Sequence, residues 1–173
     1  GMADVAASVA VLDPAEFEET KQRMLKGEGD LHRFGHLDVR EMNGTDLWNW
    51  FANERLRMTE AFRALGPKDR IPWFGPDMSA LSFATARLME TWSHGHDVAD
   101  TFGAAYPRTE RLRHVAHIGV TTRGWSYVNR GLQPPETPIR VELTSPNGDI
   151  WAWGPEHSEE MVTADAYEFC LVV

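Results

Sequence analysis

Residues 78–97 read MSALSFATARLMETWSHGHD, and this stretch predicts the central helix of a mostly α-helical fold. Asp77 or Ser79 can cap the start of the helix, which is expected to run to about Thr101, just before Gly103. Its apolar side chains fall on two opposite sides, so both sides should be covered by other parts of the protein. One side carries Phe83 and Ala86, and the other carries Leu81, Leu88 and Trp92.

A polar line follows one side of the same helix. Glu90 and His94 are about 40° apart at 100° per residue, and Asp97 returns to within about 20° of Glu90. His96 points about 200° away from His94, so these two imidazoles cannot bind one ion from an unbroken helix. A carboxylate and an imidazole one turn apart, in contrast, form half of a divalent metal site. We therefore identify Glu90 and His94 as candidate metal ligands and Asp97 as the residue that orients His94.

The expected metal is zinc, with nickel as the next choice, because an imidazole nitrogen combined with one carboxylate suits catalytic zinc. A third protein ligand has to come from another element, which leaves one position open for water or substrate. The competing interpretation is a solvated surface ion pair, since glutamate and histidine four residues apart are common on helices. The residues alone keep both interpretations open.

Other polar residues near the helices are weaker candidates. His117 can orient a ligand or touch substrate, and Arg87 can hold a substrate carboxylate. For both, and for His114, the alternative is an ordinary surface side chain. Cys170 has no cationic neighbour in sequence, so we interpret it as structural. Three further arginines can also bind a carboxylate: Arg111, Arg113 and Arg123. Two histidines, His32 and His36, are expected to face solvent.

Outward from this central helix, the chain divides into a helical part and a mixed part. We expect a helical bundle over residues 1–132 and a small α+β region over residues 133–173, because the hydrophobic period changes from helical to alternating after Pro138. The turn residues 145–148 predict a β-hairpin. Residues 1–12 are small and apolar and too short to be a stable element alone. The other expected segments are helices over 15–26, 45–65 and 109–129, loops over 27–44 and 68–76, and either helix or buried strand over 164–173.

The composition disfavours several classes of protein. The 173 residues carry 17 basic and 26 acidic side chains, and the formal net charge of −9 disfavours binding to nucleic-acid phosphates. No apolar run reaches the length of a membrane span. A single cysteine cannot form an internal disulfide, which fits a reducing compartment. Together these observations predict an acidic, cytoplasmic protein.

The segment Met78–Asp97 resembles the mycothiol-dependent maleylpyruvate isomerase and DinB-type metal-binding superfamily, and within it a subgroup of actinobacterial metal-binding proteins. Residues 72–76, 111–119 and 168–173 match the same subgroup. The resemblance implies a DinB-type bundle of up-and-down helices followed by a small α+β region.

In that superfamily, a histidine from an earlier helix joins a Glu and a His of a later helix around the metal. The last two correspond to Glu90 and His94, which the resemblance thereby supports as ligands. The first has no counterpart, because no histidine precedes His32. We therefore expect that the N-terminal helices of the family are missing or shortened in this sequence and that the C-terminal region is incomplete.

The resemblance also implies metal-assisted chemistry with a low-molecular-weight thiol, mycothiol or a similar one, in an isomerase or transferase reaction on a small electrophile. The expected partner is therefore a small-molecule substrate. Two alternatives stay open: a non-catalytic metal-binding or interaction module and, more distantly, an accessory protein of tRNA modification. The latter arises because part of the C-terminal region is similar to a wybutosine-synthesis module. The sequence does not decide whether the protein is an enzyme or whether it forms a homo-oligomer.

Overall fold

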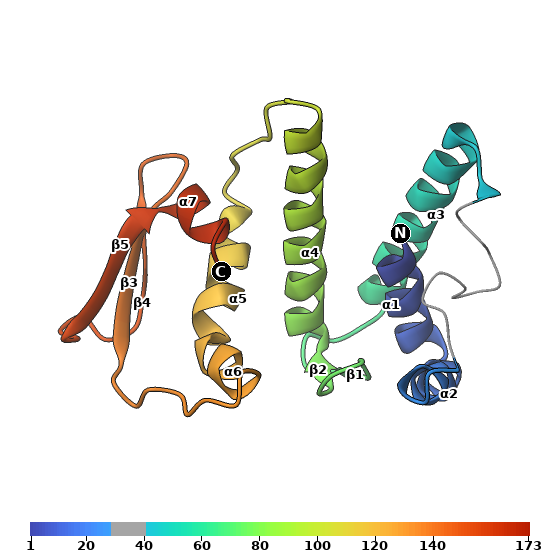
Figure 1. Ribbon diagram of the computed structural model, residues 1–173, viewed down its shortest axis with the longest axis horizontal. Helices are drawn as coiled ribbons and strands as arrows, with labels where there is room; N and C mark the ends of the chain where they lie inside the picture. Colours follow the sequence, from blue (N-terminus) through green and yellow to red (C-terminus); the bar gives the residue numbers. More distant parts are fainter. Residues whose placement is uncertain (29–40) are drawn as a thin grey trace. The chain divides into compact units, whose positions relative to one another are not determined.

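The computed structural model describes residues 1–28 and 41–173, which form two compact units, Gly1–Ala84 and Thr85–Val173. One helix, α4 (Ala80–Thr101), runs through the division between them (Figure 1). The first unit also contains α1 (Met2–Leu12), α2 (Pro14–Leu25), α3 (Gly44–Arg63), β1 (Arg70–Ile71) and β2 (Met78–Ser79). The second contains α5 (Leu112–Thr121), α6 (Arg123–Val128), β3 (Ile139–Thr144), β4 (Ile150–Trp153), β5 (Glu160–Asp165) and α7 (Ala166–Cys170).

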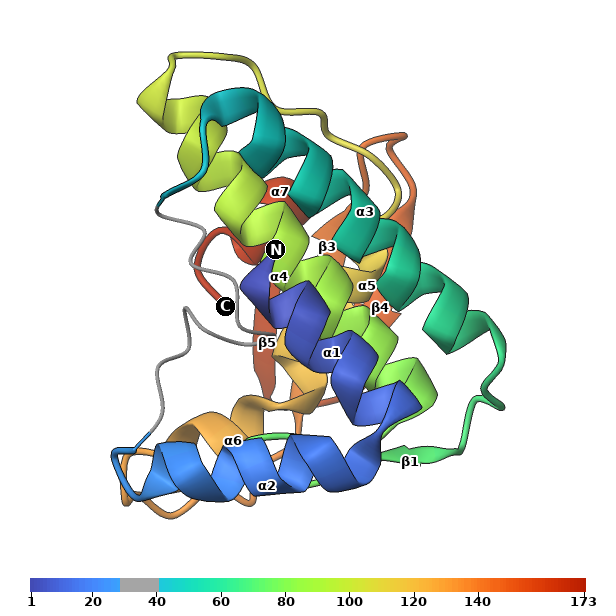
Figure 2. The ribbon, with the colours of Figure 1, turned by 90° about the vertical axis from the view of Figure 1, so that its right-hand side faces the viewer.

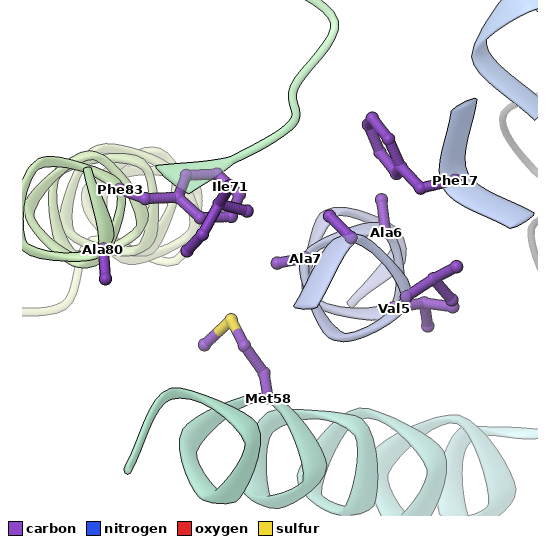
Figure 3. Packing of buried hydrophobic residues seen from close by; sticks show 10 residues of the cluster. Val5, Ala6, Ala7, Phe17, Met58, Ile71, Ala80 and Phe83 are labelled. Atoms are coloured by element: carbon purple, nitrogen blue, oxygen red, sulfur yellow. The ribbon is translucent and has the colours of Figure 1, made fainter. Parts of the chain in front are cut away.

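Residues 2–12 form a helix because neighbouring helices cover them. In α1 the residues from Asp4 to Ala10 are all buried, and the helix packs against α2 and α3 (Figure 2). Small side chains allow helices to pack closely, and Figure 3 shows Ala6 and Ala7 of α1 among the buried residues of this cluster. The segment is thus too short to be stable alone but is stabilised by tertiary packing. At the start of α2, the Asp13 side chain accepts a hydrogen bond from the backbone N–H of Glu16 at 3.0 Å, as an N-cap.

Aromatic residues complete the core of the first unit. Phe17 from α2 and Phe83 from α4 are fully buried, and both rings contact Trp73. The segment 68–76, expected to be a loop, contains the short strand β1, which pairs antiparallel with β2 directly before α4. The start of α4 thus has its Phe83 side covered within the first unit (Figure 3).

The helix expected over residues 109–129 is broken. Thr122 has φ −95° and ψ 8°, outside the helical values, and it separates α5 from α6. The hydroxyl groups of Thr121 and Thr122 donate to the carbonyls of His117 and Ile118 at 2.8 and 2.7 Å. Threonines that bond back to the preceding turn bend helices, so two in succession provide a local reason for the break.

The C-terminal sheet has the strand order β4-β3-β5. β3 and β4 form the expected antiparallel hairpin, whose turn contains Gly148 at φ +90°. β5 lies parallel to β3 and leads directly into α7, so residues 164–173 begin as strand and continue as helix. Asp165 caps α7 by accepting from the backbone N–H groups of Tyr167 and Glu168.

A second hydrophobic cluster holds the second unit together. α5 contributes Leu112, Val115 and Ala116, which pack with buried residues of the sheet and of α7. Met89 and Trp92 of α4 pack against the same cluster. The prediction of a mostly α-helical fold with a small C-terminal β region is confirmed. The division at residue 132 and the missing N-terminal helices stay predictions.

In the described ranges, 1–28 and 41–173, no helix combines the length and the apolar character needed to cross a membrane.

Candidate functional site

Glu90, His94 and Asp97 lie along one side of α4 and contact one another, as their spacing predicts. His94 Nε2 is 3.4 Å from Glu90 Oε2, and His94 Nδ1 is 3.2 Å from Asp97 Oδ2. All three residues belong to one uninterrupted helix, so the arrangement depends only on the turns of α4. The imidazole therefore lies between two carboxylates.

This geometry suits a metal half-site. If Asp97 accepts the Nδ1–H of His94, the Nε2 atom carries a lone pair and faces Glu90. Carboxylates commonly orient metal-bound histidines as Asp97 does here, by accepting the proton of the nitrogen that does not bind the metal. The side chains are accessible: His94 is 75 % exposed, Asp97 72 % and Glu90 42 %. The donor atoms fit two ligands of a divalent cation. Within residues 1–28 and 41–173, however, no group of three or more His, Cys, Asp or Glu residues is arranged to hold a metal.

The other side of α4 carries His96, which has a different role. Its Nε2 is hydrogen bonded to the Tyr167 hydroxyl of α7, and its Nδ1 is 3.3 Å from Asp100 Oδ2. The His96 side chain is only 14 % exposed, and its ring lies 5.8 Å from that of Trp92. This confirms that the two histidines point to different sides of the helix. The bond to Tyr167 spans 71 residues and has no signal in the sequence.

Aromatic rings surround His96. Tyr106 and Tyr167 have ring centroids 5.6 Å from the His96 ring, and the Arg108 guanidinium lies 4.1 Å from the centroid of Tyr167. Gly95 is part of this packing, because a Cβ atom at this position would lie 2.2 Å from the Tyr106 hydroxyl oxygen. The glycine between the two histidines therefore allows Tyr106 to approach the helix backbone.

The weaker candidates lie apart from this polar line, except Arg87. Arg87 is half-buried on α4, three residues before Glu90. On α5, His117 is exposed and accepts a hydrogen bond at its Nδ1 from the Trp153 indole N–H at 3.1 Å. His114 is exposed as well. Of the remaining candidates, Arg111 and Arg113 are exposed and Arg123 is half-buried, whereas His32 and His36 lie outside the described residues.

Cys170 is buried in the second hydrophobic cluster and is 3 % exposed. Its thiol points to the Leu112 carbonyl, with a sulfur–oxygen distance of 3.6 Å. Burial raises the pKa of the Cys170 thiol to about 12, because the thiolate would lose its hydration. At neutral pH this thiol stays protonated and is not a nucleophile.

Comparison with known proteins identifies the family. Residues 1–99 match the family described as mycothiol maleylpyruvate isomerase N-terminal domain, and the chain belongs to this family. Two uncharacterised proteins, from two strains of Mycobacterium tuberculosis, are each 40 % identical over 170 residues. The alignment covers 98 % of this chain but 66 % of each relative, so the chain spans slightly less than two thirds of their length. No protein of solved structure matches the chain.

Proposed function

We propose that this member of the family binds a divalent metal through Glu90 and His94 and uses it in thiol-dependent chemistry. The substrate would be a small electrophile, and the reaction an isomerisation or a transfer. The single observation that supports the proposal best is the pair of contacts on α4, 3.4 Å between His94 Nε2 and Glu90 Oε2 and 3.2 Å between His94 Nδ1 and Asp97 Oδ2. Family membership supplies the link to thiol chemistry.

Each residue of this polar line has a separate task. Asp97 holds the His94 ring in the tautomer whose Nε2 can donate an electron pair. Glu90 supplies a carboxylate oxygen on the same side and neutralises part of the cation's charge. A divalent metal bound there would lower the pKa of a small-molecule thiol, so that the thiolate is available at neutral pH. The exposure of His94 leaves room for such a thiol to approach.

The donor set favours zinc over harder cations. Imidazole nitrogen is a common ligand of zinc, copper, iron and nickel, whereas magnesium and calcium prefer oxygen ligands alone. Nickel is the second choice, for the same reason. A complete site needs at least one more ligand, which a further part of the chain or a second molecule would provide.

The metal content of the purified protein tests the proposal directly. We expect stoichiometric zinc or nickel by elemental analysis of protein prepared without a histidine tag. The Glu90→Gln and His94→Gln variants should each retain little metal, because each lacks one of the two proposed ligands. His114→Gln is the matched control, since His114 is an exposed histidine on α5. Equal metal content in the wild type and both ligand variants would overturn the assignment of Glu90 and His94.

Turnover separates the enzyme from its main alternative. With metal bound, consumption of a maleylpyruvate-like electrophile should depend on added mycothiol and should disappear in His94→Gln. Stoichiometric metal without any thiol-dependent turnover would instead favour a non-catalytic metal-binding module. The exposed side chains of Glu90 and His94 are compatible with that alternative as well. Binding of tRNA at physiological salt would favour the accessory role.

A further inference from the structure

We propose that Arg113 and His117 on the exposed side of α5 bind an oxyanion of a small molecule, a carboxylate or a phosphate. This site is separate from the candidate metal ligands. Met89 and Trp92 of α4 face the cluster that contains α5, whereas Glu90 and His94 lie on another side of α4. The inference therefore does not depend on the proposed metal chemistry.

The position of the proton on His117 follows from its contact with Trp153. The indole N–H of Trp153 can only donate, so the Nδ1 atom that accepts it at 3.1 Å carries no proton. Neutral His117 must then carry its proton on Nε2, on the far side of the ring from Trp153. The bond joins α5 to β4 across 36 residues, so the ring is held in place by the fold. His117 thus presents an oriented N–H donor toward solvent.

Positive charge lies beside this donor in the sequence. Arg113 precedes His117 by four residues, so the two side chains lie about 40° apart on the helix and are neighbours. Arg113 is exposed, and the described part of the chain shows no ion pair for it. The whole stretch between Glu110 and Glu136 contains no acidic residue but four arginines, in a protein of net charge −9. This segment of the chain, which contains the donor, therefore carries an excess of positive charge.

The chemistry of the pair selects the ligand. A guanidinium group binds carboxylate or phosphate oxygens with two parallel hydrogen bonds, and a neighbouring N–H can add a third. Neither group can accept a hydrogen bond in this arrangement, because the Nδ1 lone pair of His117 is already used by Trp153. The site consequently discriminates against cations and neutral donors.

The experiment is an NMR titration of the protein with inorganic phosphate and, separately, with acetate at constant ionic strength. The Trp153 indole N–H and the His117 ring report on the site. We expect saturable shifts with a dissociation constant of about millimolar for the better anion, as befits a small exposed ligand. Tighter binding of phosphate would indicate a phosphate ester as the ligand, and tighter binding of acetate a carboxylate.

Variants decide whether the pair is responsible. Arg113→Gln and His117→Gln should each weaken binding about tenfold, because each removes a hydrogen bond to a charged group. Arg111→Gln is the matched control, since Arg111 carries the same charge but lies at the N-cap of α5, more than one turn before His117. Equal weakening in Arg111→Gln and Arg113→Gln, or shifts that never saturate, would overturn the proposal. Glu90→Gln should leave the titration unchanged, so a failed metal site would not affect this result.

Discussion

His94 and His96 stand two residues apart on α4 and have opposite surroundings. His96 is 14 % exposed, lies among aromatic rings and is hydrogen bonded to Tyr167 of α7. His94 is 75 % exposed, and its ring nitrogens lie 3.4 and 3.2 Å from the carboxylates of Glu90 and Asp97 on its own helix. The first histidine connects distant parts of the second unit, whereas the second is held by local contacts and remains accessible. Two histidines of one short motif thus differ in how the protein surrounds them.

This difference has a general reason. A side chain that is needed for folding is surrounded by protein, so its polar atoms are satisfied by fixed partners. A side chain that binds an external ligand keeps at least one polar atom within reach of solvent. His96 has the fixed partners of the first kind, and His94 has the exposure that the second kind requires. The comparison predicts that substitutions on the His96 side change stability, while those on the His94 side change binding.

Replacement of His96 should have the largest effect on stability. His96→Ala removes a largely buried ring and leaves the Tyr167 hydroxyl without its partner. We expect the free energy of unfolding to fall by about 2–3 kcal/mol, from the cavity and the lost hydrogen bond together. Urea denaturation followed by circular dichroism measures it. A loss below about 0.5 kcal/mol, typical of exposed positions, would contradict the structural role of His96.

Gly95→Ala should be the next most destabilising. Alanine in place of glycine inside a helix usually stabilises by about 0.5–1 kcal/mol. Here the added Cβ would meet the Tyr106 hydroxyl oxygen at 2.2 Å, and Tyr106 packs with His96. We expect a net destabilisation of about 1–2 kcal/mol, because overpacking outweighs the helix propensity.

Gly124→Ala is the control for the expected loss of stability in Gly95→Ala. Gly124 lies in α6, and a Cβ there would meet only Pro134 atoms at 3.9 Å or more, an ordinary contact. This substitution should therefore stabilise the protein slightly in the same denaturation experiment. Stabilisation by both substitutions would show that Tyr106 moves away from Gly95 without cost.

Tyr167→Phe should destabilise by about 1 kcal/mol, since it removes one hydrogen bond and keeps the ring. The Arg108 guanidinium can still stack on phenylalanine, so that contact is retained. A double-mutant cycle with His96→Ala isolates the bond. The two effects should be less than additive by about 0.5–1 kcal/mol, and strict additivity would mean that the bond contributes nothing.

His94→Ala should have the smallest effect on stability, within about 0.5 kcal/mol in metal-free protein, because exposed side chains contribute little. Zinc should then make the comparison sharper. A metal that binds only the folded state raises the unfolding midpoint of the wild type, but not that of His94→Ala. Equal midpoint shifts in both proteins would place the metal elsewhere.

Much of this arrangement could be predicted because it is local. The side of α4 occupied by Glu90, His94 and Asp97 follows from helical geometry alone, and so does the opposite direction of His96. The mostly helical fold and the hairpin after Pro138 follow from hydrophobic periodicity. Each of these inferences depends on residues within a few positions of one another.

The features that could not be predicted depend on distant partners or on competing local bonds. The partner of His96 is 71 residues away, and the partner of His117 is 36 residues away. The break at Thr122 comes from threonine hydroxyls that bond to the preceding turn, which periodicity does not detect. Burial of the first helix depends on α2 and α3, so residues 1–12 by themselves do not reveal that this segment forms a stable helix.

Cys170 is the single cysteine of the sequence, and its burial determines whether it can supply a thiolate. Cys170 is enclosed beside the Leu112 carbonyl and keeps its proton well into the alkaline range. The polypeptide itself therefore offers no sulfhydryl anion at physiological pH. Sulfur chemistry here would be governed by the cellular supply of a diffusible thiol, and oxidants that attack accessible thiolates would leave Cys170 of the folded protein unmodified.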